Sequence, residues 1–198
     1  MDARIVKTDK KIKTAFIKLL GNNKFEQITV SGICKEAKVN RATFYLHYTD
    51  KYDLLERLEN ETILDITQLK NNIVKQFSLG TFPFFDNKLM IQILTDFYKG
   101  IDKNAVFIRN ILSVNGNLNF QYQLQKYATK LIIENLGSMS EKIAVQIPIN
   151  YLAAMVAEMQ LGILKEWLNN NQKEAPEELA RMVAKIYMIM GQNLLHKK

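Results

Sequence analysis

The densest group of hydrogen-bond donors in the sequence lies between Asn40 and Tyr48 (NRATFYLHY). These nine positions hold one arginine, two tyrosines, one histidine and one threonine, and no acidic residue separates Arg41 from Tyr48. Such side chains donate hydrogen bonds to phosphate oxygens and to base edges, and arginine can bind O6 and N7 of guanine together. A carboxylate in the same stretch would repel a phosphate. The stretch therefore indicates contact with a polyanion.

Residues suited to catalysis or metal binding are scarce in the chain. It contains two histidines, His47 and His196, one cysteine, Cys34, and no glycine-rich phosphate-binding loop. We therefore expect no enzyme, and no metal or cofactor site, because no triad, ligand set or nucleotide-binding loop is recognisable. Cys34 is expected to be a buried small hydrophobic residue, and a single cysteine fits a reducing cytoplasm.

Positive charge is concentrated at the N-terminal end of the 198-residue chain. The net charge is +7, and residues 1–48 hold ten Lys/Arg against four Asp/Glu, which is +6. This distribution indicates a polyanionic partner for that end, although a solvated lysine-rich surface has the same composition. The sequence has no run of 18 apolar residues and no apolar N-terminal segment. We therefore expect no membrane span, no secretory signal and a cytoplasmic location.

The elements that position these residues are expected to be helices, because the chain has only three prolines and eight glycines. Ile12, Phe16 and Leu20 recur at four-residue intervals, which predicts a first helix from an N-cap at Thr8 to a stop at residues 21–23. About nine helices are expected in all. The others are predicted at about 30–37, 41–48, 51–77, 87–100, 103–113, 117–137, 147–169 and 176–195, with a loop at 78–87.

Residues 29–46 have the pattern of a helix-turn-helix. Thr29 and Asn40 stand at the N-cap positions of two short helices, and a turn at Lys38 and Val39 joins them. In this motif the second helix enters the DNA major groove with its N-terminal residues leading. We expect Arg41, Ala42 and Thr43 to read bases, and Thr29, Tyr45, His47 and Lys51 to contact phosphates. His47 could instead only cap or pack.

The same stretch resembles the DNA-binding segment of the tetracycline-repressor (TetR) family of bacterial transcription regulators. The matching motifs, within about residues 8–57, are F-x-x-I-T-V-x-x-I (25–33), T-F-Y-x-H-Y (43–48) and D-K-x-x-L (50–54). The resemblance implies an all-α dimer, with a three-helix DNA-binding domain over 1–50 and a helical ligand- or partner-binding and dimerisation domain over 51–198. The DNA contacts that follow from the motif and the resemblance are Thr29, Lys38, Asn40, Arg41, Ala42, Thr43, Tyr45, His47 and Lys51.

One residue departs from the family pattern. The turn of the helix-turn-helix usually carries glycine in this family, whereas this chain has Lys38. A left-handed backbone at that position would place a modest strain on lysine, which has a Cβ atom. In exchange, the lysine adds a positive charge beside the DNA.

The two helices expected at 147–169 and 176–195 are apolar and joined by a short polar connection. Such a hairpin, paired with its copy about a two-fold axis, would form a four-helix bundle. In the family the last two helices usually form the dimer interface, and a dimer presents two recognition helices to a palindromic operator. The segments G-I-L-K-E-W-L-x-N (162–170) and P-E-E-L-A (176–180) resemble a subtype that includes regulators of dihydroxyacetone utilisation.

The middle of the chain is rich in aromatic residues, which could form core or line an effector pocket. We expect a repressor that a small-molecule or protein effector releases from DNA. The alternative is a partner-dependent activator or adaptor of the dihydroxyacetone-regulator type. A membrane-surface protein is disfavoured, because the three-helix core needs the apolar face of the first helix. The aromatic residues of the middle region, where an effector pocket would lie, are Phe82, Phe84, Phe85, Phe97, Tyr98, Phe107, Phe120, Tyr122 and Tyr127.

Overall fold

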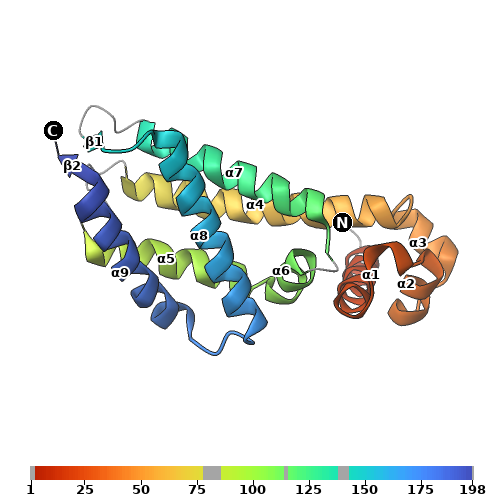
Figure 1. Cartoon of the computed structure of the whole chain (residues 1–198). Helices are drawn as coiled ribbons and strands as arrows, with labels where there is room; N and C mark the ends of the chain where they lie inside the picture. Colours follow the sequence, from red (N-terminus) through yellow and green to blue (C-terminus); the bar gives the residue numbers. More distant parts are fainter. Residues whose placement is uncertain (1–2, 78–85, 114–115, 138–142, 198) are drawn as a thin grey trace. The chain divides into compact units, whose positions relative to one another are not determined.

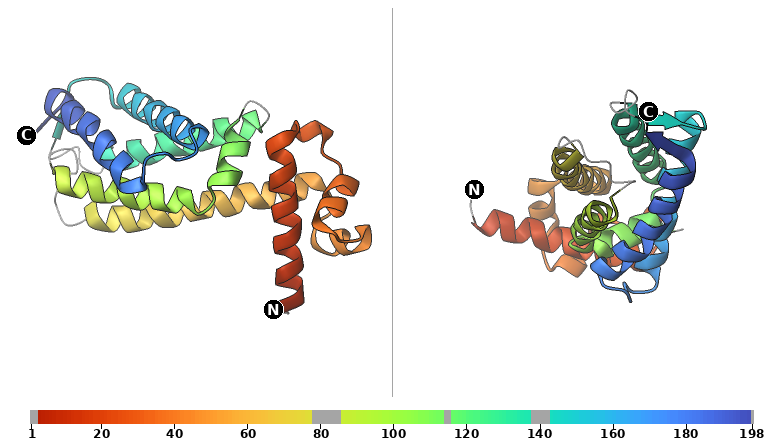
Figure 2. Two further views of the ribbon diagram at one scale, coloured as in Figure 1. Left: turned by 90° about the horizontal axis from the view of Figure 1, so that it is seen from below. Right: turned by 90° about the vertical axis from the view of Figure 1, so that its left-hand side faces the viewer.

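The computed structural model describes residues 3–77, 86–113, 116–137 and 143–197, and these residues are mainly helical (Figures 1 and 2). The expected all-α class, with about nine helices, is confirmed over this part of the chain. The helices are α1 (Ala3–Asn22), α2 (Val30–Ala37), α3 (Arg41–His47), α4 (Lys51–Phe77), α5 (Asn87–Asp102), α6 (Ala105–Leu112), α7 (Leu118–Gly137), α8 (Ile149–Asn169) and α9 (Pro176–Leu194), with a 3-10 helix η1 (Phe25–Gln27).

Two local features differ from the sequence-based expectation. The first helix begins at Ala3, so Thr8 lies inside α1 and does not cap it; residues 3–7 contain no glycine or proline that would stop a helix. Two short strands, β1 (Ile143–Val145) and β2 (Leu195–Lys197), pair antiparallel. Three residues are too few for an alternating pattern to reveal a strand. Most of the loop expected at 78–87, including Phe82, Phe84 and Phe85, lies outside the described residues.

The chain forms two compact units, and α4 and α7 contribute residues to both. The first unit consists of residues 1–64 and 106–121, and the second of residues 65–105 and 122–198. Most of α6 and the start of α7 belong to the first unit, and the division expected at residue 50 stays a prediction. Asn110 Nδ2 donates to the carbonyl oxygen of Ile17, 2.8 Å away, and Asn117 Nδ2 to Glu59 Oε1 at 2.9 Å.

The core of the first unit holds the helix-turn-helix in place. Phe16 on α1, Ile33 on α2, Phe44 on α3 and Leu54 on α4 are all fully buried. Burial of side chains of this size contributes about 1.5–3 kcal/mol each, so the four helices depend on one another for stability. The expected burial of Cys34 is confirmed as well.

The core of the second unit is built on α5, α8 and α9. Tyr98 on α5 and Trp167 on α8 are buried, with ring centres 5.5 Å apart. Gln160 on α8 donates to the Tyr98 hydroxyl at 2.9 Å and accepts from the Tyr187 hydroxyl on α9 at 3.1 Å. In the part of the chain that the structure describes, α5 packs most extensively against α9, whereas the sequence indicated α8 with α9. The buried Ala180 of α9 has a short side chain, which allows close helix approach.

Candidate nucleic-acid interface

Side-chain caps fix the start of three successive helices in the first unit. Thr29 Oγ1 accepts a hydrogen bond from the Gly32 N–H at 3.0 Å, and Asn40 Oδ1 accepts one from the Thr43 N–H at 2.6 Å. Asp50 caps α4 in the same way. The caps expected at Thr29 and Asn40 are therefore confirmed, in contrast to the cap expected at Thr8. Each such cap stabilises a helix by about 1 kcal/mol, so the position where α3 begins is well defined.

The turn between α2 and α3 is closed by a left-handed residue. Lys38 has φ 54° and ψ 47°, and the Val39 N–H donates to the carbonyl oxygen of Cys34 at 3.0 Å. This is the position that helices usually end with glycine, and lysine bears a backbone strain there of roughly 1 kcal/mol. The condition set out for this turn, a left-handed backbone at Lys38, is therefore met. The Lys38 side chain is exposed beside the start of α3.

Helix α3 has one buried and one exposed face. Phe44 is fully buried and Thr43 is partly buried. Arg41, Ala42 and Tyr45 are exposed and lie on one side, because positions separated by three or four residues share a helix face. The structure thus brings Arg41 and Ala42, expected to read bases, onto one face with Tyr45, expected to contact phosphate, whereas Thr43, the third residue expected to read bases, is partly buried. Their contact with DNA stays a prediction.

Leu46 is an outward-facing residue of α3 that the sequence reasoning missed. It is 85% exposed, although leucine is usually buried. Its position four residues after Ala42 places it on the same helix face, and this spacing could have identified it. An apolar side chain there could contact a thymine methyl group in the major groove.

Arg41 and Tyr45 contact each other across one turn of α3. Arg41 Nη2 donates to the Tyr45 hydroxyl oxygen, 3.2 Å away, and the guanidinium carbon lies 5.9 Å from the centre of the Tyr45 ring. The hydrogen bond that Arg41 donates to Tyr45 raises the pKa of the Arg41 guanidinium. The base-reading candidate therefore has a defined direction before any ligand binds.

Lys51 lies at the start of α4, but its ammonium group points into the protein. It donates to the carbonyl oxygens of Phe25, Glu26 and Ile28 at 2.9, 3.0 and 2.8 Å. An ammonium group has three N–H donors, so these bonds occupy all of them. The geometry gives Lys51 a structural role, which is to hold η1 against α4. The phosphate contact predicted from its place in the motif would require it to exchange one of these bonds.

His47 lies beside Asp9 in a charged cluster on the first unit. Its Nδ1 atom is 3.9 Å from Asp9 Oδ1, its side chain is 11% exposed, and its ring stacks on Tyr48. The Tyr48 hydroxyl donates to Asp9. Lys13 Nζ lies 3.0 Å from Asp9 and 2.6 Å from Glu61, which joins α1 to α4. The structure thus places His47 in a packed position, and its phosphate contact stays a prediction.

Burial and hydrogen bonds act in opposite directions on the ionisation of this cluster. Burial opposes ionisation of Asp9, but hydrogen bonds from Tyr48 and Lys13 outweigh it, and the pKa of Asp9 falls below its usual value. Burial and the hydrogen bond to Asp9 raise the pKa of Tyr48. Asp9 is therefore a carboxylate at neutral pH, with Tyr48 as a hydrogen-bond donor to it.

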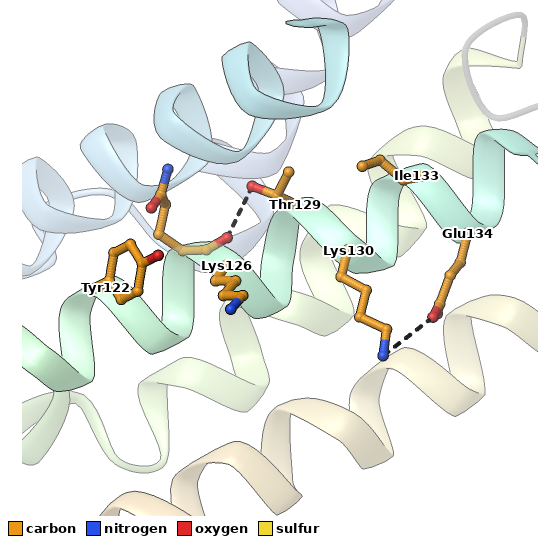
Figure 3. A pocket seen from close by; sticks show the side chains of 7 residues that line it. Tyr122, Lys126, Thr129, Lys130, Ile133 and Glu134 are labelled. Atoms are coloured by element: carbon orange, nitrogen blue, oxygen red, sulfur yellow. Dashed lines mark hydrogen bonds and ion pairs between the residues drawn. The ribbon is translucent and has the colours of Figure 1, made fainter. Parts of the chain in front are cut away.

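A groove of about 640 Å³ runs along α7 in the second unit (Figure 3). Thr129 Oγ1 donates back to the Gln125 carbonyl oxygen at 3.0 Å, and Lys130 lies 3.9 Å from Glu134. Of the nine aromatic residues, Tyr122 lines this groove, whereas Tyr98, Phe107 and Phe120 belong to the core. The side chains that line the groove are Tyr122, Gln125, Lys126, Thr129, Lys130, Ile133 and Glu134.

Two family models match the chain where these features lie. The model described as "Bacterial regulatory proteins, tetR family" matches residues 14–58, which contain the helix-turn-helix. The model described as "Transcriptional regulator C-terminal region", of the TetR type, matches residues 89–188. The chain belongs to the TetR family of bacterial transcriptional regulators. The helix-turn-helix of this TetR regulator thus corresponds to the DNA-binding element of the family.

Two curated relatives and one solved structure are similar to this TetR regulator. The dhaKLM operon transcriptional activator DhaS of Lactococcus lactis is 28% identical over 119 residues, 60% of this chain and 56% of DhaS. The HTH-type regulator YxbF of Bacillus subtilis is 33% identical over 67 residues, 33% of this chain and 18% of YxbF. Both matches span less than two thirds of the relative. A TetR regulator from Streptococcus agalactiae is 26% identical, with 96% of each chain covered and a TM-score of 0.57.

Within the described residues of this TetR regulator, no helix is long and apolar enough to cross a membrane. The same residues contain no group of three or more His, Cys, Asp or Glu side chains placed to hold a metal ion.

Proposed function

We propose that this TetR regulator is a repressor that binds a palindromic DNA operator as a homodimer and leaves it when an effector binds. The outward face of α3 is the observation that carries the proposal. Arg41, Ala42, Tyr45 and Leu46 are exposed there, whereas Phe44 is fully buried. A helix with a donor-rich, acid-free face and capped at its N-terminus suits the major groove.

Positive charge around α3 suits the phosphates on either side of the groove. Lys38 is exposed in the turn before α3, and several basic residues within α1 are exposed as well. Phosphate contacts of this kind fix the orientation of the protein, whereas base contacts select the sequence. We assign the phosphate contacts to Thr29, Lys38, Asn40, Tyr45 and His47, with diffuse attraction from Arg4, Lys7, Lys10 and Lys11. Lys51, whose ammonium group bonds to three carbonyl oxygens, supports the interface by holding η1 against α4.

An exposed apolar face on α8 and α9 supports the dimer. Tyr151 and Met155 on α8, and Met182, Ile186 and Ile189 on α9, are large apolar residues that are all exposed. On each helix they recur at three- or four-residue spacing, so they share a face. Clustered exposed apolar residues mark interaction sites. We assign this face to a second copy of the chain, because a two-fold dimer would present two α3 helices about one DNA turn apart.

The effector would act through the second unit. The groove along α7 combines apolar, amide and charged side chains, which suits an amphiphilic small molecule. A protein effector is the other candidate. Binding that disfavours the DNA-bound spacing of the two α3 helices would weaken operator affinity, with a coupling of typically 1–3 kcal/mol.

The second candidate function is a partner-dependent activator or adaptor. It is favoured by the similarity to DhaS, whose name describes an activator of the dhaKLM operon. In that case the exposed face of α8 and α9 would have a second task, the binding of another protein. In either case we expect a cytoplasmic protein without enzymatic activity that requires no cofactor.

Titration of an operator duplex at several salt concentrations tests the proposal. Each phosphate contact from a positively charged side chain contributes about one unit to the slope of log affinity against log salt, so we expect a slope of roughly −5 to −10 for a dimer. A reporter gene with the operator over its promoter then gives the sign of regulation. Lower expression with the protein present supports a repressor, and higher expression supports the activator. A slope near zero would reject the repressor and favour an adaptor that acts by binding another protein.

A further inference from the structure

The contact between Arg41 and Tyr45 suggests how α3 selects a base. We propose that Tyr45 is a positioning residue that aims Arg41 at guanine, so that each operator half-site has a G·C pair facing the start of α3. The inference rests on the proposed function, because it concerns the same DNA interface. Its first support is the hydrogen bond of 3.2 Å from Arg41 Nη2 to the Tyr45 hydroxyl.

The core of the first unit holds Tyr45 in place. Its ring packs edge-on against Phe44, with ring centres 5.6 Å apart and an angle of 87° between the planes. Phe44 is fully buried, whereas Tyr45 is half exposed. The ring of Tyr45 thus has one contact with the core, and its hydroxyl group, on the surface of α3, is the partner of Arg41.

Arg41 keeps the donors that guanine recognition needs. The guanidinium group has five N–H donors, and the bond to Tyr45 uses one of them. The remaining donors can form the two parallel bonds to O6 and N7 of guanine. A directed arginine loses less side-chain freedom on binding than one that rotates in solvent, so the correct base is bound at a smaller entropic cost.

Tyr45 can also contact the DNA backbone without losing this function. Its hydroxyl oxygen accepts the bond from Arg41, and its own O–H remains a donor for a phosphate oxygen. A neutral hydroxyl group releases no counterions, so loss of this bond would leave the salt slope unchanged. Base preference at one position is therefore the property that separates positioning of Arg41 from a phosphate contact alone.

The experiment compares Tyr45→Phe, Arg41→Ala and the double variant on the operator selected by the unmodified protein. Discrimination is the ratio of affinities for that operator and for duplexes with the G·C pair replaced. We expect Arg41→Ala to reduce discrimination about 5- to 150-fold at this pair. Tyr45→Phe keeps the ring on Phe44 and should reduce discrimination about 2- to 12-fold at the same pair, the range for one hydrogen bond.

Two further results complete the test. In the Arg41→Ala background, Tyr45→Phe should have no additional effect on discrimination, because its partner is absent. Tyr52→Phe, which removes the hydroxyl group of another exposed tyrosine of the same unit, should leave discrimination unchanged. Circular dichroism of each variant shows whether the fold is retained.

Three results would overturn the inference. The first is a selected operator in which Arg41→Ala reduces discrimination at no G·C pair. The second is a Tyr45→Phe variant that loses affinity equally for all duplexes. The third is a Tyr45→Phe variant that loses no affinity for any duplex. An unmodified protein that selects no operator would instead overturn the proposed function, and this inference with it.

Discussion

Lys51 illustrates how a motif residue can have a task other than the expected one. Its ammonium group bonds to three carbonyl oxygens around η1 and lies 4.6 Å from the centre of the Phe25 ring. Its place in the helix-turn-helix was readable from the sequence, but the direction of its side chain was not. That direction depends on where η1 lies, and the sequence pattern showed no 3-10 helix at 25–27.

We expect Lys51→Ala to lower the free energy of unfolding by about 1–3 kcal/mol, because hydrogen bonds to a charged group are lost. DNA binding should weaken for all sequences alike, since the start of α4 would lose its support beside α3. The salt slope should not change. Thermal unfolding and salt titrations measure both effects. A stable variant whose slope falls by about one unit per protomer would show that Lys51 binds phosphate instead.

The lowered pKa of Asp9 predicts how stability depends on pH. Its usual value is 3.8, and the folded state holds the pKa below it. Asp9 therefore contributes stability that is fully present above its unfolded pKa and is lost as pH falls through the folded pKa. Asp9→Asn should destabilise the protein by about 1 kcal/mol at pH 7, through the weakened bonds with Tyr48 and Lys13.

Denaturant titrations of the unmodified protein and of the Asp9→Asn variant between pH 7 and pH 3 test this expectation. The difference in the free energy of unfolding should be constant at neutral pH and should shrink below about pH 4. Ser31→Ala, on the exposed face of α2, provides a control without a carboxylate. A difference that stays constant down to pH 3 would mean that Asp9 has an unshifted pKa in the folded protein.

At the scale of elements, local signals were sufficient for most helices. The caps at Thr29 and Asn40 fixed two helix starts from the sequence, because an N-cap needs only the residue itself and a nearby N–H. The first turns of α1 and the strand pair were missed, since neither has a distinctive local pattern. The close approach of α5 and α9 was also missed. It depends on buried small residues whose partners lie far away in the sequence.

The turn between α2 and α3 allows a test of strain against charge. Lys38→Gly should raise the free energy of unfolding by about 0.5–1 kcal/mol, because glycine adopts φ 54° without a Cβ clash. It should also weaken DNA binding and reduce the salt slope by about one unit per protomer if Lys38 contacts phosphate. Lys35→Gly, in the last turn of α2, is the matched control and should be destabilising. Unchanged DNA affinity in Lys38→Gly would remove this residue from the interface.

At the scale of the whole molecule, the apolar face of α8 and α9 supports a specific prediction. Ile189→Glu places a charge on the proposed dimer interface and should raise the dimer dissociation constant at least about tenfold, because a buried unpaired charge costs several kcal/mol. Affinity for a palindrome should fall, whereas affinity for a single half-site should not. Analytical ultracentrifugation and duplex titrations measure these effects.

Val106→Glu is the matched control for the interface variant. Val106 on α6 is 59% exposed and Ile189 on α9 is 61% exposed. Both substitutions therefore add one carboxylate at an equally accessible site. We expect the Val106 variant to remain a dimer. Equal dissociation of both variants, or of neither, would reject α8 and α9 as the dimer interface.

The hydrophobic pattern indicated amphipathic helices at the C-terminal end, but not which apolar residues would be left uncovered. Met155 and Ile189 are exposed, whereas Leu152 and Val183 of the same helices are buried. Periodicity marks a face as apolar, and the packing of α5, α8 and α9 decides which part of it the chain itself covers. The resemblance to the TetR family supplied the dimer expectation, and the structure supplies the residues with which to test it.

Selection of bound fragments from a random duplex pool, at near-physiological salt, tests the central proposal most directly. A two-fold dimer that reads bases with α3 should recover a palindrome whose half-sites lie about one helical turn apart. Each half-site should contain the G·C pair assigned to Arg41. Recovery of no preferred sequence from the same pool would contradict operator recognition by this protein alone.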